Sequence, residues 1–452
     1  MRAKIRATLK RKFVADTLTL QLSGFLTQAS GFVSSALLAF ALGAHGQGLY
    51  VMAVTLQALL FNLVSVGVIQ ATVSQIASAT ARGLDDKVTA WLAFLVKTYV
   101  VTGTLMIGIG YFALPELCER MYGDDLPVDE ARNLGVWAWW LAWWILIDTP
   151  RAATHVAFHA TRRMRPSAQL DAAHELVRLF LTIAGVVITN SPAGAVIGEV
   201  ASRVAASYLA LQMYASARRD GGTHLPRWRE ILAVAPSIPL LKGLRMGLRL
   251  GLLKNATTFF INVLPRLLLS STSFAWVAYF NIAQKMMGLA TTAMQGVSRN
   301  VLPALAEKRG KNDFEGFRKL YWRASLIGGG AIAVAIGLGL LVARPLIVRF
   351  YPDDYAEPVF LCCCILALGM IPTGFGIALD PFYILTNKLK ANLTLALIGA
   401  IVTIPINVYW TMLWPETGPV WGQALYLSWS LVHFIYIGLW LREKRHATEW
   451  VH

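Results

Sequence analysis

The chain has 452 residues, of which 56% are hydrophobic and 15% are charged, and its mean hydropathy is +0.53. Soluble domains carry about a quarter charged residues, so this composition indicates a polytopic membrane protein and excludes an ordinary water-soluble domain. The formal net charge of +16 would favour nucleic acid as a partner of a soluble protein. In a membrane protein, positive residues instead indicate which side of the bilayer a connecting segment faces, so we expect no nucleic-acid partner.

Apolar stretches long enough to cross about 30 Å of hydrocarbon, which takes roughly 20 helical residues, occur twelve times along the chain. They predict an all-α protein with transmembrane helices at 17–41, 48–80, 90–113, 132–160, 167–189, 194–216, 246–270, 274–305, 320–343, 356–386, 391–413 and 419–440. The connecting segments alternate between basic and non-basic. Because the amino terminus and the tail are basic, the positive-inside rule predicts that both termini are cytoplasmic.

Short motifs recur at about half the chain length. RMYGDD at 120 is followed by RFYPDD at 349, and TRRMR at 161 by TNKLK at 386. YGDD also occurs in the metal-binding turn of polymerases, but its second copy replaces Gly with Pro. We therefore interpret these aspartates as helix caps and expect neither a metal nor a cofactor. The recurrence predicts two parallel six-helix repeats, with a bundle at 1–217, a cytoplasmic connector at 218–245, a second bundle at 246–441 and a tail at 442–452.

Four stretches carry a family resemblance: the whole of 274–305, LGAHGQGLYVMA at 42–53, RFYPDDYAEPVFL at 349–361 and INVYWTMLWPETGPVWGQA at 406–424. They resemble polysaccharide flippases of the O-antigen type, in the multidrug/oligosaccharidyl-lipid/polysaccharide (MOP) exporter superfamily. The resemblance implies a V-shaped pair of bundles in the inner (plasma) membrane. It also implies transport of a polyprenyl-diphosphate-linked oligosaccharide to the outer leaflet for surface polysaccharide biosynthesis. The implied partners are this lipid-linked saccharide, membrane lipids and the polysaccharide polymerase machinery, and we expect a monomer.

Two other functions remain open, namely a cation-coupled multidrug antiporter and, from another class, a membrane glycosyltransferase or ligase. The first two spans carry amides where lipid II flippases carry arginines, and Asp16 lies at or before the start of the first span, where drug antiporters often place an acid. Both differences favour polysaccharide lipids. The largest external loop, of about 18 residues, is too short for a glycosyltransferase active site, so we expect no enzyme.

A diphosphate can leave water only if cations and trapped water accompany it, and basic residues at membrane depth are expected to face a cavity or a partner. The predicted substrate ligands are Lys254, Lys285, Arg178, Arg266 and Lys97. The two lysines at 254 and 285 have no acidic neighbour one turn away, so a cavity is favoured over snorkelling. Snorkelling is the stronger alternative for Arg266 and Lys97, which lie nearer the outer and inner faces.

Acidic neighbours offer an alternative explanation, a structural ion pair, for the remaining basic residues. Arg203 lies four residues after Glu199, which predicts a local ion pair. Arg178 shares a helical face with Glu175, so a structural cluster and a binding site are both open, although we predict that Arg178 is the cation facing the two lysines. Asp380 in the tenth span either binds a coupling proton or sodium ion or pairs with a basic residue across the bundle.

Overall fold

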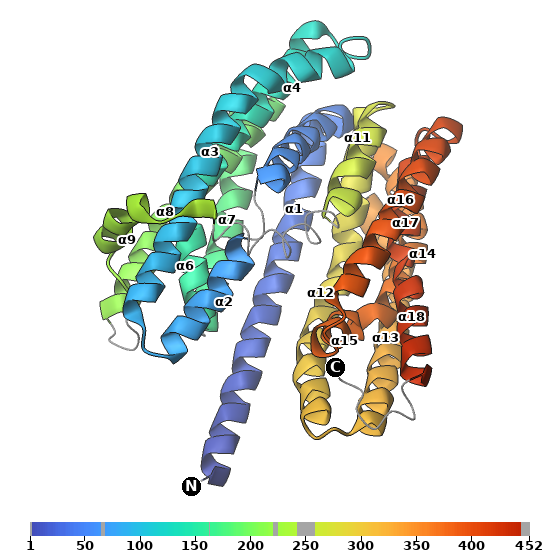
Figure 1. Ribbon diagram of the computed structural model, residues 1–452. Helices are drawn as coiled ribbons and strands as arrows, with labels where there is room; N and C mark the ends of the chain where they lie inside the picture. Colours follow the sequence, from blue (N-terminus) through green and yellow to red (C-terminus); the bar gives the residue numbers. More distant parts are fainter. Residues whose placement is uncertain (1, 65–67, 162, 220–224, 242–257, 444–452) are drawn as a thin grey trace. The chain divides into compact units, whose positions relative to one another are not determined.

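The computed structural model describes residues 2–64, 68–161, 163–219, 225–241 and 258–443, and every regular element in these ranges is helical (Figure 1). The chain divides into two compact units, Met1–Phe259 and Phe260–His452. The predicted limits of the bundles, the connector and the tail stay a prediction, because much of the stretch between the two units lies outside the described residues.

Unit 1 begins with α1 and ends with the connector. Its helices are α1 (Arg2–Val64), α2 (Val68–Ala81), α3 (Asp85–Tyr122), α4 (Val128–Ala142), α5 (Trp144–Ile147), α6 (Thr149–Ala160), α7 (Met164–Thr189), α8 (Pro192–Arg219) and α9 (Trp228–Val234), followed by the 3-10 turn η1 (Ala235–Ser237). A buried apolar core from α2, α3, α6 and α8 extends to the connector residues Leu225, Ile231 and Ala235. The described part of the connector is thus packed against the helices of unit 1.

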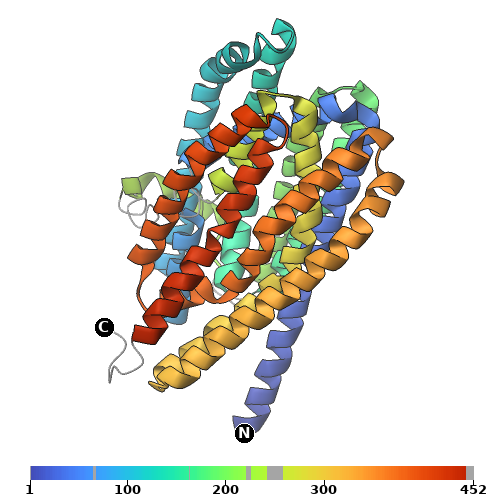
Figure 2. The same cartoon turned by 90° about the vertical axis from the view of Figure 1, so that its right-hand side faces the viewer.

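Unit 2 begins with a π-helical turn that runs directly into a short helix. Its elements are η2 (Phe259–Val263), α11 (Leu264–Ser270), α12 (Phe274–Gly310), α13 (Phe314–Phe350), η3 (Asp353–Tyr355), α14 (Ala356–Phe375), η4 (Gly376–Ala378), α15 (Leu379–Leu385), α16 (Leu389–Leu413), α17 (Gly418–Ser428) and α18 (Ser430–Glu443). Figure 2 shows α13 and α14 side by side. An aromatic core of Phe317, Tyr321, Phe382 and Tyr383 joins α13 to α15.

Three predicted spans contain more than one helical element. The fourth forms α4, α5 and α6, the tenth forms α14, η4 and α15, and the twelfth forms α17 and α18. Pro150 and Pro381 lie in the first turns of α6 and α15, where a proline without an N–H group is tolerated but cannot continue a preceding helix. Eight helices among the described residues are long and apolar enough to cross a membrane, so the count of twelve stays a prediction.

The first predicted span and the beginning of the second lie in α1, which consists of two helices joined at a kink. Gly43 inside α1 has φ 65° and ψ 179°, a conformation that glycine adopts without the penalty of a Cβ atom. The predicted turn between residues 41 and 48 is therefore confirmed as a glycine kink.

Each unit packs its sixth predicted span closely against its fifth. Gly194 and Gly198 lie in α8, and Gly418 and Gly422 lie in α17, 224 residues later in both cases. A methyl group on Gly198 would overlap the backbone of Leu181 in α7, and one on Gly422 would overlap a side chain of α16. Two small residues four apart allow such close helix contacts in membranes. This close packing at a pair of glycines occurs in both units, as the predicted duplication requires.

The repeated motifs RMYGDD and RFYPDD lie at corresponding places, each at the end of a long helix. Tyr122 ends α3 and Tyr351 directly follows α13, and both side chains are buried. The predicted capping role of the following aspartates is wrong for α4, because its N-cap residue is Pro127 and no side chain caps this helix. The buried tyrosines, rather than the exposed aspartates, are what the two loops share structurally.

Candidate functional site

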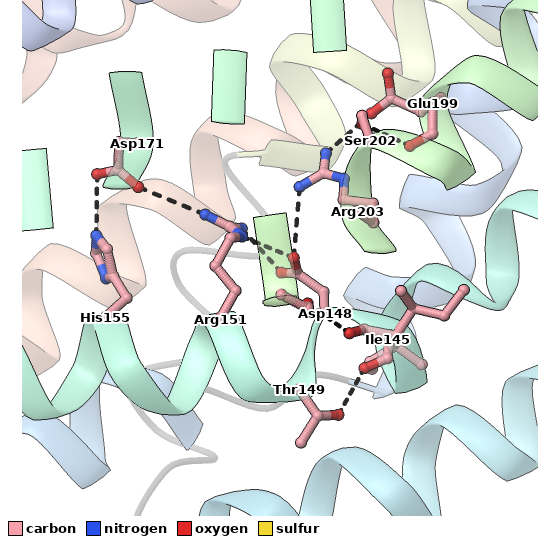
Figure 3. Close-up of polar contacts among 11 residues, drawn as sticks. Ile145, Asp148, Thr149, Arg151, His155, Asp171, Glu199, Ser202 and Arg203 are labelled. Atoms are coloured by element: carbon pink, nitrogen blue, oxygen red, sulfur yellow. Dashed lines mark hydrogen bonds and ion pairs between the residues drawn. The ribbon is translucent and has the colours of Figure 1, made fainter. Parts of the chain in front are cut away.

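The break in the fourth predicted span places charged residues inside unit 1. The Thr149 hydroxyl donates to the carbonyl of Ile145 at 2.9 Å, which links the first residue of α6 back to α5. Asp148 at this junction is only 4% exposed. Its carboxylate accepts two hydrogen bonds from Arg151, from Nε at 2.7 Å and from Nη2 at 2.8 Å (Figure 3). A two-point contact of this kind fixes both side chains in position.

This pair is the centre of a charged network that joins α6, α7 and α8. Arg151 Nη1 lies 3.5 Å from Asp171 Oδ1, and His155 Nε2 lies 3.2 Å from the other oxygen of that carboxylate. On the opposite side, Arg203 Nη1 lies 3.9 Å from Asp148 Oδ1. Figure 3 shows these contacts as one chain from His155 to Arg203.

Glu199 on α8 extends the network towards α1 and the middle of α7. It accepts a hydrogen bond from Arg203 at 3.0 Å, which confirms the predicted ion pair. It also lies 3.5 Å from Arg178 Nη1 and accepts a bond from the Tyr50 hydroxyl at 3.4 Å. Arg178 in turn donates to Glu175 at 2.8 Å. Three arginines and four carboxylates therefore share the interior of unit 1.

The placement of Arg178 bears on its predicted role as a substrate ligand. Its side chain is 19% exposed and lies between the carboxylates of Glu175 and Glu199. An anion would have to displace these partners, and leaving one member of a buried ion pair alone is strongly unfavourable. The contacts show that Arg178 links α7 to α8, and its binding of substrate stays a prediction.

Unit 2 holds a polar cluster of different chemistry, which we call the α12 polar face. It consists of Arg266 on α11, Asn281, Gln284 and Lys285 on α12, and Gln423 on α17. The three α12 residues are spaced by three and four positions, so they lie on one side of the helix. Arg266 Nη2 donates to Asn281 Oδ1 at 2.9 Å and to Gln284 Oε1 at 2.8 Å, and Gln284 Nε2 donates to Gln423 Oε1 at 3.1 Å.

Two of the predicted ligands belong to the α12 polar face: Arg266 takes part in these hydrogen bonds, and Lys285 follows Gln284 on α12. Both are half-buried. The snorkelling alternative for Arg266 is wrong, because its guanidinium donates to side chains of the same unit. Amide oxygens accept hydrogen bonds without carrying a net charge, so these contacts orient the guanidinium and do not neutralise it.

Lys97 lies against the connector. Its Nζ donates to the carbonyls of Pro236 and Ile238, both at 2.7 Å, and the Tyr214 hydroxyl of α8 donates to the carbonyl of Pro226 at 3.0 Å. The ammonium group therefore fixes the segment that follows α9 on α3. Its predicted role as an anion ligand stays untested.

Of the two remaining predicted residues, Asp380 lies among the described residues and Lys254 does not. Asp380 lies in the first turn of α15, close to the turn at 386–388, and its side chain is exposed. Its coupling role stays a prediction. Lys254 lies outside the described residues.

The sequence analysis missed Asp148, Arg151, Asn281, Gln284 and Gln423. The first two are spaced i, i+3 inside an apolar span, a signal that could have been used. Asn281 lies four residues before Lys285, so its position on the same face was also predictable. Gln423 approaches Gln284 only through the tertiary packing of α12 and α17, and nothing local in the sequence indicates this contact.

Long apolar helices that enclose charged and amide side chains define a multi-pass membrane protein. No family model and no curated protein sequence matches the chain. Solved structures do share its fold. One is a multidrug resistance transporter of the MATE family in the MOP superfamily, in an inward-facing conformation, with TM-score 0.66, 15% identity and coverage of 95% of this chain and 96% of that chain.

Two further MOP-type structures extend the likeness. A MOP superfamily transporter from Pyrococcus furiosus, described as having a binding pocket of reverse polarity, gives TM-score 0.61 and 17% identity over 94% of this chain and 95% of that chain. The lipid II flippase MurJ, in an inward closed conformation, gives TM-score 0.68 and 13% identity over 93% and 87%. The chain therefore has the MOP transporter fold, which confirms the predicted all-α membrane protein. The proteins that share this fold here are transporters rather than enzymes.

Proposed function

We propose that the chain is a flippase that moves a polyprenyl-diphosphate-linked oligosaccharide from the cytoplasmic to the outer leaflet of the inner membrane, for surface polysaccharide biosynthesis. The observation that carries this proposal is the α12 polar face. In it Arg266 is hydrogen-bonded to Asn281 and Gln284, Gln284 is hydrogen-bonded to Gln423, and Lys285 follows Gln284 on α12. Guanidinium and ammonium groups bind phosphate oxygens, and amides bind sugar hydroxyl groups.

The proposal includes the other predicted residues in defined roles. Lys254, Arg178 and Lys97 are further candidate ligands of the headgroup, and Asp380 is the candidate site of a coupling ion. Both termini are cytoplasmic, and the protein acts as a monomer beside the polysaccharide polymerase machinery.

The runner-up is a cation-coupled multidrug antiporter, and a specific observation favours it. Unit 1 carries the buried carboxylates of Asp148 and Glu199, and buried acids in membrane helices attract cations. In the structure both are paired with arginines, which lowers their availability to a drug cation. A membrane glycosyltransferase or ligase has the weakest support, because the structures that share the fold are transporters.

The proposed function is tested in proteoliposomes with a fluorescently labelled polyprenyl-diphosphate disaccharide. We expect the chain to move this lipid between leaflets, and a variant with both Lys254→Gln and Lys285→Gln to lose most of the activity while still inserting. Arginine at the two positions should retain part of the activity, because the charge is kept. Efflux of a lipophilic cation under an imposed pH or sodium gradient, without lipid flipping, would establish the antiporter instead.

In cells, deletion of the gene should remove surface polysaccharide and cause a lipid-linked saccharide to accumulate. A drug antiporter would leave the polysaccharide intact when deleted. The accumulated lipid would also identify the saccharide.

A further inference from the structure

The two units place different side chains at one equivalent position. Glu199 directly follows Gly198 on α8, and Gln423 directly follows Gly422 on α17, 224 residues later. Both side chains are buried, at 7% and 4% exposed. Since each glycine fits against the preceding helix, the backbone holds the following side chain in a corresponding place in each unit.

The partners of these two residues show what the exchange changes. Glu199 accepts bonds from Arg203 and lies beside Arg178, so its charge is opposed by two guanidinium groups. Gln423 instead accepts a bond from Gln284, whose own oxygen accepts from Arg266. In unit 1 the carboxylate of Glu199 contacts the arginines, whereas in unit 2 the amide of Gln423 contacts the amide of Gln284, which contacts Arg266.

We propose that Asn281, Gln284 and Gln423 are positioning residues, which fix the Arg266 guanidinium for an anionic headgroup while preserving its positive charge. The two hydrogen bonds to Arg266 both leave from Nη2, at 2.9 and 2.8 Å, so the group is held at one end. A phosphate is recognised best by a guanidinium of fixed orientation, since its donors then match two oxygens at once. The amide at position 423 is thus the feature that selects an anion.

This inference rests on the proposed function only for the identity of the anion as a lipid-linked diphosphate. A purely structural role would be different: the amides would crosslink α11, α12 and α17, as amides in membrane helices do. The two roles separate when an amide is exchanged for a carboxylate of the same shape. In Gln423→Glu the carboxylate can still accept the bond from Gln284 Nε2, and in Asn281→Asp it can still accept the bond from Arg266 Nη2. Both hydrogen bonds therefore survive while a negative charge is added.

The experiment compares Gln423→Glu and Asn281→Asp with the wild-type full-length chain in nanodiscs. Gln169→Glu, at an exposed position of α7, is the matched control, because it makes the same change of charge outside the cluster. The probe is farnesyl diphosphate, with farnesol as the neutral analogue, and binding is followed by tryptophan fluorescence. Melting temperature is measured for every variant.

We expect both cluster variants to bind farnesyl diphosphate at least about tenfold more weakly, which corresponds to about 1.4 kcal/mol. Their affinity for farnesol and their melting temperatures should stay near those of the wild type, and the control should bind both probes normally. If Gln423→Glu does not fold, Asn281→Asp alone decides, because its carboxylate accepts the bond from Arg266 directly. Equal diphosphate affinity in a folded cluster variant and in the wild type overturns the inference.

Flipping of the labelled saccharide lipid by the same preparations separates this inference from the proposed function. A wild-type chain that binds farnesyl diphosphate more tightly than both cluster variants, yet flips no lipid-linked saccharide, would refute the proposed function and leave the inference standing. A chain that flips the lipid while Gln423→Glu binds diphosphate normally would refute the inference alone. A wild-type chain that binds no diphosphate would overturn the inference.

Discussion

Replacing Glu199 with Gln should destabilise unit 1, because the change removes the negative charge between two arginines while keeping the shape of the side chain. The side chains of Glu199 and Arg203 are each 10% exposed and that of Arg178 is 19% exposed, so water cannot readily solvate the charges left behind. Breaking a buried ion pair by removing one partner costs about 3 to 5 kcal/mol. Asp148 and Glu175 still oppose the two arginines, which places the expected loss near the lower value, about 3 kcal/mol.

Thermal unfolding measures this loss. In a chain of about 150 to 250 residues, each kcal/mol shifts Tm by about 2 to 4 °C, so we expect Tm to fall by about 6 to 12 °C. Cys118 lies in unit 1 and is buried and free, and it is one of four cysteines in the chain. With Cys362, Cys363 and Cys364 replaced by Ala, a thiol-reactive dye therefore reports the unfolding of unit 1 specifically.

The matched control is Glu116→Gln, which breaks an i, i+4 pair with Arg120 at 2.7 Å. These side chains are 59% and 76% exposed, and exposed pairs contribute about 1 kcal/mol or less. Equal shifts of Tm for Glu116→Gln and Glu199→Gln would refute the reasoning that burial makes the Glu199 contacts strong.

Three further outcomes are expected. Lys97→Met removes two hydrogen bonds to the connector, so trypsin should cut the connector faster. An unchanged cleavage rate would contradict the conclusion that Lys97 fixes the connector on α3. Gly198→Leu forces a side chain into the backbone of α7 and should abolish folding, whereas Gly337→Leu, with open space around its Cβ position, should express normally as membrane-inserted protein. The hydrogen bond from Lys308 holds the pKa of Asp313 below its usual range, so the stabilisation is present above the pKa of the unfolded state. It is lost as pH falls through the folded pKa, and Asp313→Asn should reduce the acid-induced fall of Tm.

Hydropathy was a strong guide to the helices, because a backbone in hydrocarbon must satisfy its own hydrogen bonds and helices do so locally. The breaks were not predictable from hydropathy, since Pro150 and Pro381 lie within apolar stretches that score as continuous spans. They depend on where a proline can begin a new first turn and on how the neighbouring helices pack.

In the candidate site, too, contacts within one helix were predictable from the sequence, whereas contacts between helices were not. The Glu199–Arg203 pair was predictable because both residues lie on one helix face. Arg266 appeared to be a snorkelling residue, because its partners Asn281 and Gln284 belong to the next helix and Gln423 to the last predicted span. Sequence spacing describes contacts within one helix, whereas the direction of an arginine between helices is decided by the side chains that its neighbours present.

A duplicated fold can keep its backbone contacts and still separate two chemical tasks. The glycines at 194, 198, 418 and 422 are required in both units, because the closeness of the adjacent helix excludes a larger side chain. The residue after the second glycine is under no such restriction, and it is Glu199 in one unit and Gln423 in the other. A negative charge at this place holds Arg203 and Arg178 in a structural network, whereas the neutral amide of Gln423 accepts a bond from Gln284, which in turn orients Arg266. If the protein is the flippase proposed above, the arrangement in unit 2 is the one that suits an anionic headgroup.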